Sequence, residues 1–310
     1  MVTCHGLQPP VIDDNQRHHR LHHPTVWGDF FLGFRPCTPA QCQSMKSKAQ
    51  VMKEELRTRI ADSGSADVTL KLELVDALQR LGLDYHYKKE IDDFLCGIND
   101  DGDEPYDLHT TTLQFYLLRK QGYNVSPDVF LKFRDVRGNI TCNDTRSLLD
   151  MYNAAHVRTH GEGTLDRDIA YTKDRLERIL EQSLSPSVSL DEVRHALEMP
   201  LFRRPRRVER ERDQYSGQQQ GMSTVEACME ENNYTAKEDA YSKLRELIEE
   251  SWMDISEEHF RPAGAQPPAQ LLEVVVDATR MLDFLYKDQD AYTIPQALKR
   301  VADSIYVDPI

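Results

Sequence analysis

The sequence predicts an all-α fold, and three features of the chain support this class. Apolar residues recur at helical spacing through most of the sequence, glycines stand where helices would end, and no run alternates at period two with turn residues at both ends. A length of 310 residues is sufficient for two domains of ordinary size or for one large domain.

End signals place the helices in the first two thirds of the chain. Gly82 stands where a helix C-cap would lie, and Ser126 followed by Pro127 is typical of an N-cap and the first helical residue. Asn143 or Asp144 is expected to cap a later helix. The expected helices are 46–60, 70–81, 84–98, 108–121, 128–134, one from the cap at 143 or 144 to 155, 165–183 and 188–198.

Several of the expected helices have an apolar face that predicts burial, among them those over 46–60 and 236–255. Around residues 46–60, the side chains that share one side are Met45, Val51, Met52, Leu56 and Ile60. Near the C-terminus, a capping-box pattern opens a helix over 236–255, whose inward residues are expected to be Ala240, Leu244, Leu247, Ile248 and Trp252. Two further helices are expected over 271–286 and 294–305.

Residues 202–221 separate the two helical parts. They include six arginines, three acids and a cluster of glutamines, with almost no apolar side chain. Such a segment cannot bury enough apolar area to offset its ordering entropy, so a polar linker or junction is expected there. The first residues are also polar and contain proline, and residues 1–21 are expected to be a disordered arm.

Composition excludes several classes of protein. The formal net charge of −14 argues against a nucleic-acid partner, because phosphate binding needs a basic face and residues 203–207 form the only basic cluster. No apolar run approaches membrane-spanning length, so no membrane partner is expected. The first sixteen residues lack a signal-peptide core and the composition of a transit peptide, which favours the cytosol. The six scattered cysteines are interpreted as reduced thiols.

The carboxylates and histidines of the chain include several groups that could be considered as metal sites. Four histidines between residues 17 and 23 could bind a metal, but a solvated arm fits them better. Asp92 and Asp93 fail the D-D-x-x-D pattern at its last position, and the acidic loop 99–107 does not follow EF-hand order. Glu246, Glu250 and Asp254 share one helix face, for which a solvated face is favoured over a magnesium site.

Several segments resemble, in order, the plant terpene synthase family. Arg17 and Trp27 are similar to the ends of the family's R-R-x8-W element, and residues 23–31 resemble its H-P-S-x-W-G-D-x-F element. Residues similar to the N-terminal helical domain are 78–83, 107–123, 149–160 and 200–204; those similar to the end of the catalytic domain are 223–229, 251–254, 283–293 and 307–310. The resemblance covers nearly the whole chain outside the junction.

The resemblance implies an organisation in two helical parts. Residues 22–201 correspond to the terpene synthase N-terminal helical domain, which is α/α barrel-like, and residues 222–310 to a C-terminal remnant of the class I terpenoid synthase domain. Most of the catalytic domain between them is missing, so the chain is interpreted as internally truncated. The family members that it resembles are cytosolic sesquiterpene synthases, which act on a prenyl diphosphate, here farnesyl diphosphate.

The resemblance also defines what the truncation removes. In the family, a D-D-x-x-D and an N-D-x-x-S-x-x-x-E element hold three Mg²⁺ ions on the diphosphate, and neither element is present here. Mg²⁺ is therefore a cofactor by resemblance, and no metal ligands are assigned. Departure of the diphosphate leaving group requires several Mg²⁺ ions to stabilise its negative charge.

Four residues of the family's site are matched. Asp290 and Tyr292 are similar to the D-G-Y-T of the loop that closes the pocket, although Ala291 replaces its glycine. Arg17 and Trp27 match the N-terminal lid, and His18 replaces its second arginine, so the lid's usual isomerisation-related role is not carried over.

Three hypotheses about function follow from these observations. The first is an inactive, truncated sesquiterpene synthase, and the second is a residual synthase that recruits other ligands, for example Glu246 and Glu250. The third is a helical interaction module that associates with a full-length synthase.

Overall fold

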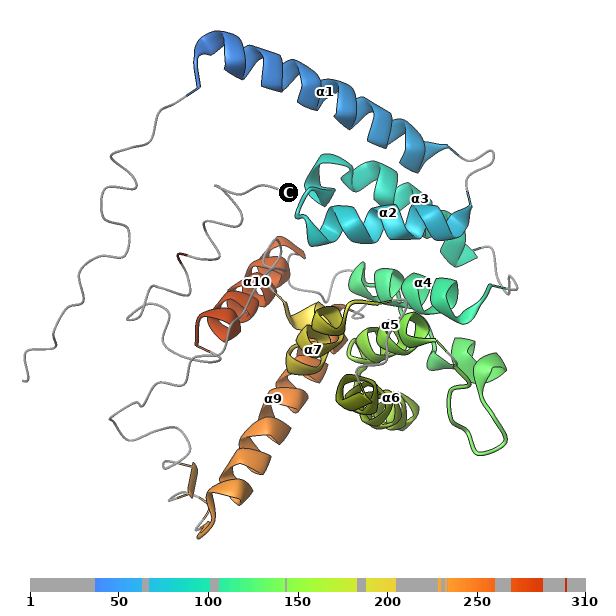
Figure 1. Ribbon diagram of the computed structural model, residues 1–310, viewed down its shortest axis with the longest axis vertical. Helices are drawn as coiled ribbons and strands as arrows, with labels where there is room; N and C mark the ends of the chain where they lie inside the picture. Colours follow the sequence, from blue (N-terminus) through green and yellow to red (C-terminus); the bar gives the residue numbers. More distant parts are fainter. Residues whose placement is uncertain are drawn as a thin grey trace, which may run out of the picture. The chain divides into compact units, whose positions relative to one another are not determined.

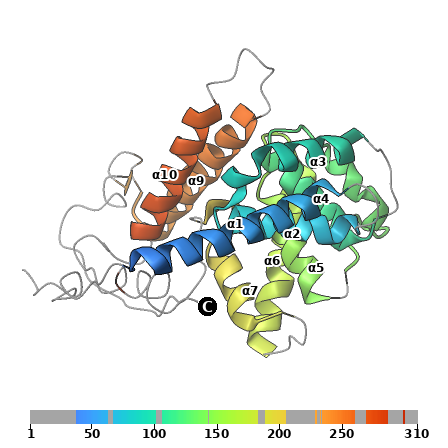
Figure 2. The ribbon, with the colours of Figure 1, turned by 90° about the horizontal axis from the view of Figure 1, so that it is seen from above.

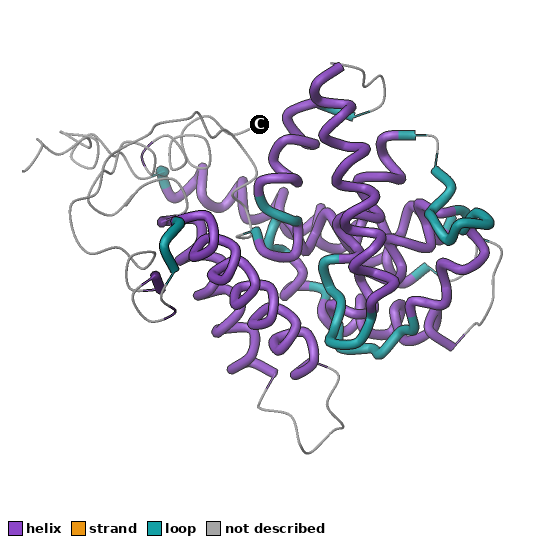
Figure 3. The backbone as a smooth tube through the Cα atoms, turned by 90° about the horizontal axis from the view of Figure 1, so that it is seen from below, coloured by secondary structure: helices purple, strands orange, loops and turns teal. Residues whose placement is uncertain are grey.

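The computed structural model describes residues 37–62, 67–100, 106–142, 144–182, 188–204, 228–229, 232, 234–259, 269–286 and 299. All of them lie within one compact unit, Cys37–Ile310. These residues form helices joined by loops, with one isolated antiparallel bridge between Arg134 and Ile140 and no strand (Figure 3). The predicted all-α class is confirmed.

Each long helix of the sequence prediction that lies in the described residues is present; most ends lie within a few residues of those expected, but α1 begins at Pro39 rather than at residue 46. The helices are α1 (Pro39–Ala61), α2 (Val68–Arg80), η2 (Asp84–His86), α3 (Lys88–Asp100), α4 (Leu108–Lys120), η3 (Pro127–Phe133), α5 (Thr145–Ala155), α6 (Gly163–Gln182), α7 (Leu190–Glu198), η4 (Leu201–Arg203), α9 (Lys237–His259) and α10 (Ala269–Tyr286).

The expected end signals act as predicted. The Asp144 carboxylate accepts a hydrogen bond from the Ser147 backbone N–H at 2.8 Å, which caps α5. Gly82 follows α2 with φ +62°, a left-handed conformation that glycine adopts without steric cost. The helix expected over 128–134 is instead the 3-10 helix η3, which ends when Arg134 becomes extended and pairs with Ile140.

α4 lies at the centre of the N-terminal helices. It packs between α2 and α5, and α5 in turn packs against α6 (Figure 1). α4 is buried on most of its circumference, including Phe115, Leu117 and the charged Arg119. α1 lies over α2 and α3 at one side of this stack (Figures 1 and 2).

Two of the apolar faces predicted to be buried, those of α1 and α9, are only partly so. In α1, Ile60 is buried and Leu56 half-buried, whereas the side chains of Met45, Val51 and Met52 are exposed. The prediction was wrong for these three because α1 packs through its C-terminal part. Helical periodicity shows which residues share a face, but it does not show how much of that face packs against another element.

The C-terminal helices show the same pattern. In α9, Ala240 and Trp252 are buried, but Leu247 and Ile248, which were predicted to point inward, are exposed. In α10, Val276 is buried, and the exposed apolar side chains are Leu271, Val274, Val275, Met281 and Leu282. None of the helices that the structure describes is long and apolar enough to cross a membrane.

The start of the expected polar junction is folded. Phe202 and Arg203 are 3% and 8% exposed and belong to η4, whereas the sequence prediction placed them in a linker that begins at residue 202. The Phe202 ring lies 5.7 Å from the Trp252 ring of α9, and this long-range contact is the reason for the difference. Residues 205–221 of the junction, the arm at residues 1–21 and the helix expected over 294–305, except for residue 299, lie outside the described residues.

Candidate functional site

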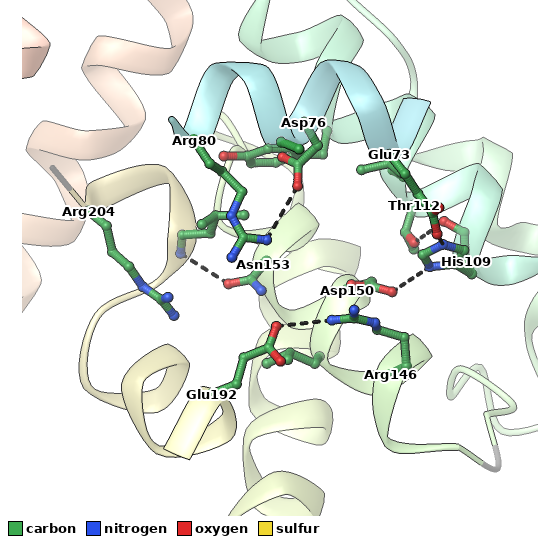
Figure 4. A pocket seen from close by; sticks show the side chains of 15 residues that line it. Glu73, Asp76, Arg80, His109, Thr112, Arg146, Asp150, Asn153, Glu192 and Arg204 are labelled. Atoms are coloured by element: carbon green, nitrogen blue, oxygen red, sulfur yellow. Dashed lines mark hydrogen bonds and ion pairs between the residues drawn. The ribbon is translucent and has the colours of Figure 1, made fainter. Parts of the chain in front are cut away.

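A cavity of about 270 Å³ lies among the N-terminal helices, between α2, α4, α5, α7 and η4 (Figure 4). α2, α4 and α5 each line the cavity with four residues at positions i, i+3, i+4 and i+7. These four positions share one face of a helix. The lining residues are Glu73, Asp76, Ala77 and Arg80 of α2; His109, Thr112, Leu113 and Tyr116 of α4; Arg146, Leu149, Asp150 and Asn153 of α5; and Glu192, Leu201 and Arg204.

His109 is held between two carboxylates at one end of the cavity. Its Nδ1 lies 2.6 Å from Asp150 Oδ2 and its Nε2 lies 3.2 Å from Glu73 Oε1 (Figure 4). The hydrogen bond to Asp150, with a smaller contribution from Glu73, raises the pKa of His109 to about 9 although burial opposes the shift. His109 is therefore an imidazolium at neutral pH.

Two arginines of the cavity are paired as well. Arg146 Nη1 donates to Glu192 Oε1 at 3.0 Å, and Arg80 Nη1 lies 3.5 Å from Asp76 Oδ2. Asn153 accepts a hydrogen bond from the Leu201 backbone N–H at 3.0 Å, which fixes η4 at the edge of the cavity. The lining thus has four acids and, with His109 charged, four bases, so its charges compensate one another.

This charge-compensated lining does not suit a magnesium–diphosphate centre. Mg²⁺ requires several hard oxygen ligands in near-octahedral geometry, and the carboxylates of the cavity are engaged by basic side chains. Within the described residues, no three His, Cys, Asp or Glu side chains gather as a metal site would require. Glu246 and Asp254 of α9 lie on a solvated face, where Glu246 pairs with Lys243 at 2.9 Å.

The residues predicted from the sequence to contribute to catalysis lie outside the described residues. These are Asp290 and Tyr292 of the pocket-closing loop, and Arg17 and Trp27 of the N-terminal lid. The cavity itself was not predicted. Its signal in the sequence is the i, i+3, i+4, i+7 set of mostly polar residues that recurs on α2, α4 and α5, which becomes visible once those helices are known to be neighbours.

The hydrogen bond from His109 to Asp150 can be tested directly. We expect Asp150→Asn to lower the pKa of His109 from about 9 toward its ordinary value of 6.5, because the largest stabilising contact of the imidazolium is lost. A raised folded-state pKa stabilises the fold below pH 6.5, and this contribution is lost as the pH rises through about 9. NMR titration of the His109 ring measures the shift. Glu192→Gln is the control, and a His109 pKa unchanged by Asp150→Asn would contradict the assignment.

The fold and the cavity define an all-helical protein whose polar pocket lies within its N-terminal helices. The family model described as the terpene synthase N-terminal domain matches residues 26–197, more than half of the chain. The chain belongs to the terpene synthase family.

Curated relatives are plant sesquiterpene synthases. The chain is 49% identical over 226 residues to the (E)-beta-caryophyllene synthase of Zea mays, a match that covers 73% of this chain and 39% of that protein. It is 34% identical over 302 residues to the (E)-beta-farnesene synthase of Zea diploperennis, covering 92% of this chain and 56% of that protein. The chain therefore spans only part of the length of these relatives.

A solved structure is also similar. It is the isoprene synthase from grey poplar leaves, Populus x canescens, in complex with three Mg²⁺ ions and dimethylallyl-S-thiolodiphosphate. The TM-score is 0.47 at 35% identity, and the match covers 53% of this chain and 32% of that one.

Proposed function

We propose that this chain is a sesquiterpene-synthase-type protein that does not ionise farnesyl diphosphate. In this proposal, its full-length relatives perform a Mg²⁺-dependent ionisation and cyclisation of a prenyl diphosphate. The sesquiterpene synthases to which the chain is similar support the parent activity. The observation that supports inactivity is the lack, in the continuous sequence, of both acidic elements that would hold Mg²⁺.

The physical reason is the charge of the leaving group. A diphosphate departs only if the negative charge that develops on it is stabilised, and several Mg²⁺ ions in a cage of carboxylate oxygens provide that stabilisation. The described residues offer salt-bridged carboxylates instead, and a carboxylate already neutralised by an arginine or an imidazolium is a poor ligand for a divalent cation.

The position of the gap supports an internal truncation. The sequence passes from the end of the N-terminal domain through residues 202–221 to segments that resemble the end of the catalytic domain. The 302-residue match to the farnesene synthase includes 92% of this chain but only 56% of that protein. We infer that the part of the catalytic domain from its start through its second metal element has no counterpart here.

Incubation of the purified chain with farnesyl diphosphate and Mg²⁺, followed by gas chromatography and mass spectrometry, tests the proposal. We expect no hydrocarbon above a boiled control, while the full-length maize caryophyllene synthase, assayed in parallel, gives product. Turnover clearly above the boiled control would overturn the proposal. In that case, loss of turnover in Glu246→Gln with Glu250→Gln would identify recruited ligands on α9.

A further inference from the structure

Glu249 of α9 lies against two arginines of the N-terminal helices. Arg203 of η4 donates to it through Nη1 at 2.6 Å and Nη2 at 2.8 Å, and Arg158 donates through Nη2 at 2.9 Å. The paired contacts from Arg203 have the fork geometry in which a guanidinium binds a carboxylate most strongly. Arg158 and Arg203 are far apart in the sequence from Glu249, so these bonds join segments on the two sides of the junction.

Both arginines depend on nearby carboxylates because they are buried. The side chains of Arg158 and Arg203 are each 9% exposed, whereas that of Glu249 is 34% exposed. Arg158 is also paired with Asp166 at 2.5 Å. For Arg203, Glu249 is the one carboxylate within salt-bridge distance among the described residues. Burial alone would raise the pKa of Glu249, but hydrogen bonds from Arg203 and Arg158 outweigh it and lower this pKa to about 2.

Aromatic side chains next to Glu249 also contact Arg203 and join α9 to η4. The Arg203 guanidinium lies 5.4 Å from the Trp252 ring centroid, and the Phe202 ring packs edge-on against Trp252. About two turns beyond Glu249 on α9, Glu257 accepts hydrogen bonds from both the backbone N–H and the Nδ1 of His160, at 3.0 and 2.7 Å. α10 also contacts η4, because Arg280 Nε donates a hydrogen bond to the Phe202 carbonyl at 2.7 Å.

We propose that Glu249 docks α9 onto the N-terminal helices, so that the remnant of the catalytic domain is anchored to the N-terminal domain through one carboxylate shared by two buried arginines. Glu257 adds a contact to the exposed His160, but Glu249 is the acid of α9 that pairs with the two buried arginines. Glu246 is 58% exposed and pairs with Lys243 on its own helix, and Glu250 is exposed. This inference does not depend on the proposed function, because it concerns only contacts within the chain.

The two tryptophans of the chain provide a direct test. In a Trp27→Phe background, Trp252 is the remaining tryptophan, and its emission reports on burial beside Phe202 and Arg203. We expect Glu249→Gln to shift this emission to the red and to increase its quenching by acrylamide severalfold. The matched control is Glu250→Gln, which removes an exposed carboxylate from the next position of α9 and is expected to leave both signals unchanged.

Hydrogen exchange of the full chain, with both tryptophans present, is the second measurement. We expect peptides from α9 to exchange faster in Glu249→Gln while peptides from α4 remain protected. We expect Arg203→Lys to give a smaller effect in the same direction, because lysine keeps the charge but lacks the fork. Equal exchange of α9 in Glu249→Gln and Glu250→Gln would overturn the proposal. A loss of protection in α4 and α9 alike would also overturn it, because Glu249 would then stabilise the whole chain rather than dock one helix.

Discussion

Replacement of Glu162 by glutamine is expected to lower the free energy of unfolding by about 3 kcal/mol or more, as is typical when one partner of a buried ion pair is removed. Glu162 immediately precedes α6, and its two carboxylate oxygens accept hydrogen bonds from Arg119 at 2.6 and 2.5 Å. The Arg119 side chain is fully buried on α4, where a charged group is costly unless it is closely compensated.

The geometry around Arg119 explains why this change should be large. Arg119 also donates to the Val125 carbonyl at 3.0 and 2.6 Å and to the Val157 carbonyl at 3.2 Å, so it joins the turn after α4 to the loop between α5 and α6. Glutamine retains the shape of Glu162 and one acceptor oxygen, but it removes the negative charge. The buried guanidinium then loses the charge of this close carboxylate, and a neutral acceptor in its place stabilises it less.

Urea denaturation followed by circular dichroism measures the loss. The matched control is Asp174→Asn on α6, which removes a carboxylate from an exposed pair with Arg178 and is expected to change stability by less than about 0.5 kcal/mol. Arg119 and Thr159 hold the pKa of Glu162 below its ordinary value against the effect of burial, so its contribution is present above that ordinary value and is lost as the pH falls. Equal losses in the two variants would contradict this account.

Local signals in the sequence were sufficient to predict most helix ends. Asp144 caps α5 and Ser126 caps η3. These caps could be predicted because the capping side-chain oxygen and the backbone N–H that it accepts from are only two or three residues apart. The family motifs identified the terpene synthase family for a similar reason, since they are short patterns read along the chain. The all-α class and the family were therefore available before any coordinates.

Contacts between distant residues could not be predicted in this way. Arg119 is hydrogen-bonded to Glu162, 43 residues away in the sequence, and Arg203 to Glu249, 46 residues away. Periodicity places such residues on a helix face, but the partner depends on which helices become neighbours and in which register. This also explains why the cavity around His109 was missed, and why Phe202 was assigned to a linker when it packs against α9. In each case the position of the residue depends on a side chain that belongs to another helix.

Phe115→Ala is expected to have an effect of similar size, about 3–5 kcal/mol of unfolding free energy, because it leaves a cavity on a helix that is buried on most of its circumference. Phe115 is 1% exposed on α4. Its ring meets the Phe130 ring of η3 edge-on with centroids 4.9 Å apart, and the Arg119 guanidinium lies 4.3 Å from its centroid. Alanine therefore loses packing, an aromatic pair and a cation–π contact together.

Phe115→Leu separates these contributions, because leucine restores most of the volume without the ring. We expect it to cost less than about 1.5 kcal/mol in the same urea titration, which would assign the larger part of the alanine effect to packing. A leucine variant as unstable as the alanine variant would show instead that the ring contacts dominate. Since Phe115 and Glu162 both contact Arg119, the double variant with Glu162→Gln is expected to deviate from additivity, as residues that share a partner do. Strict additivity would mean that the ring and the carboxylate stabilise the guanidinium independently.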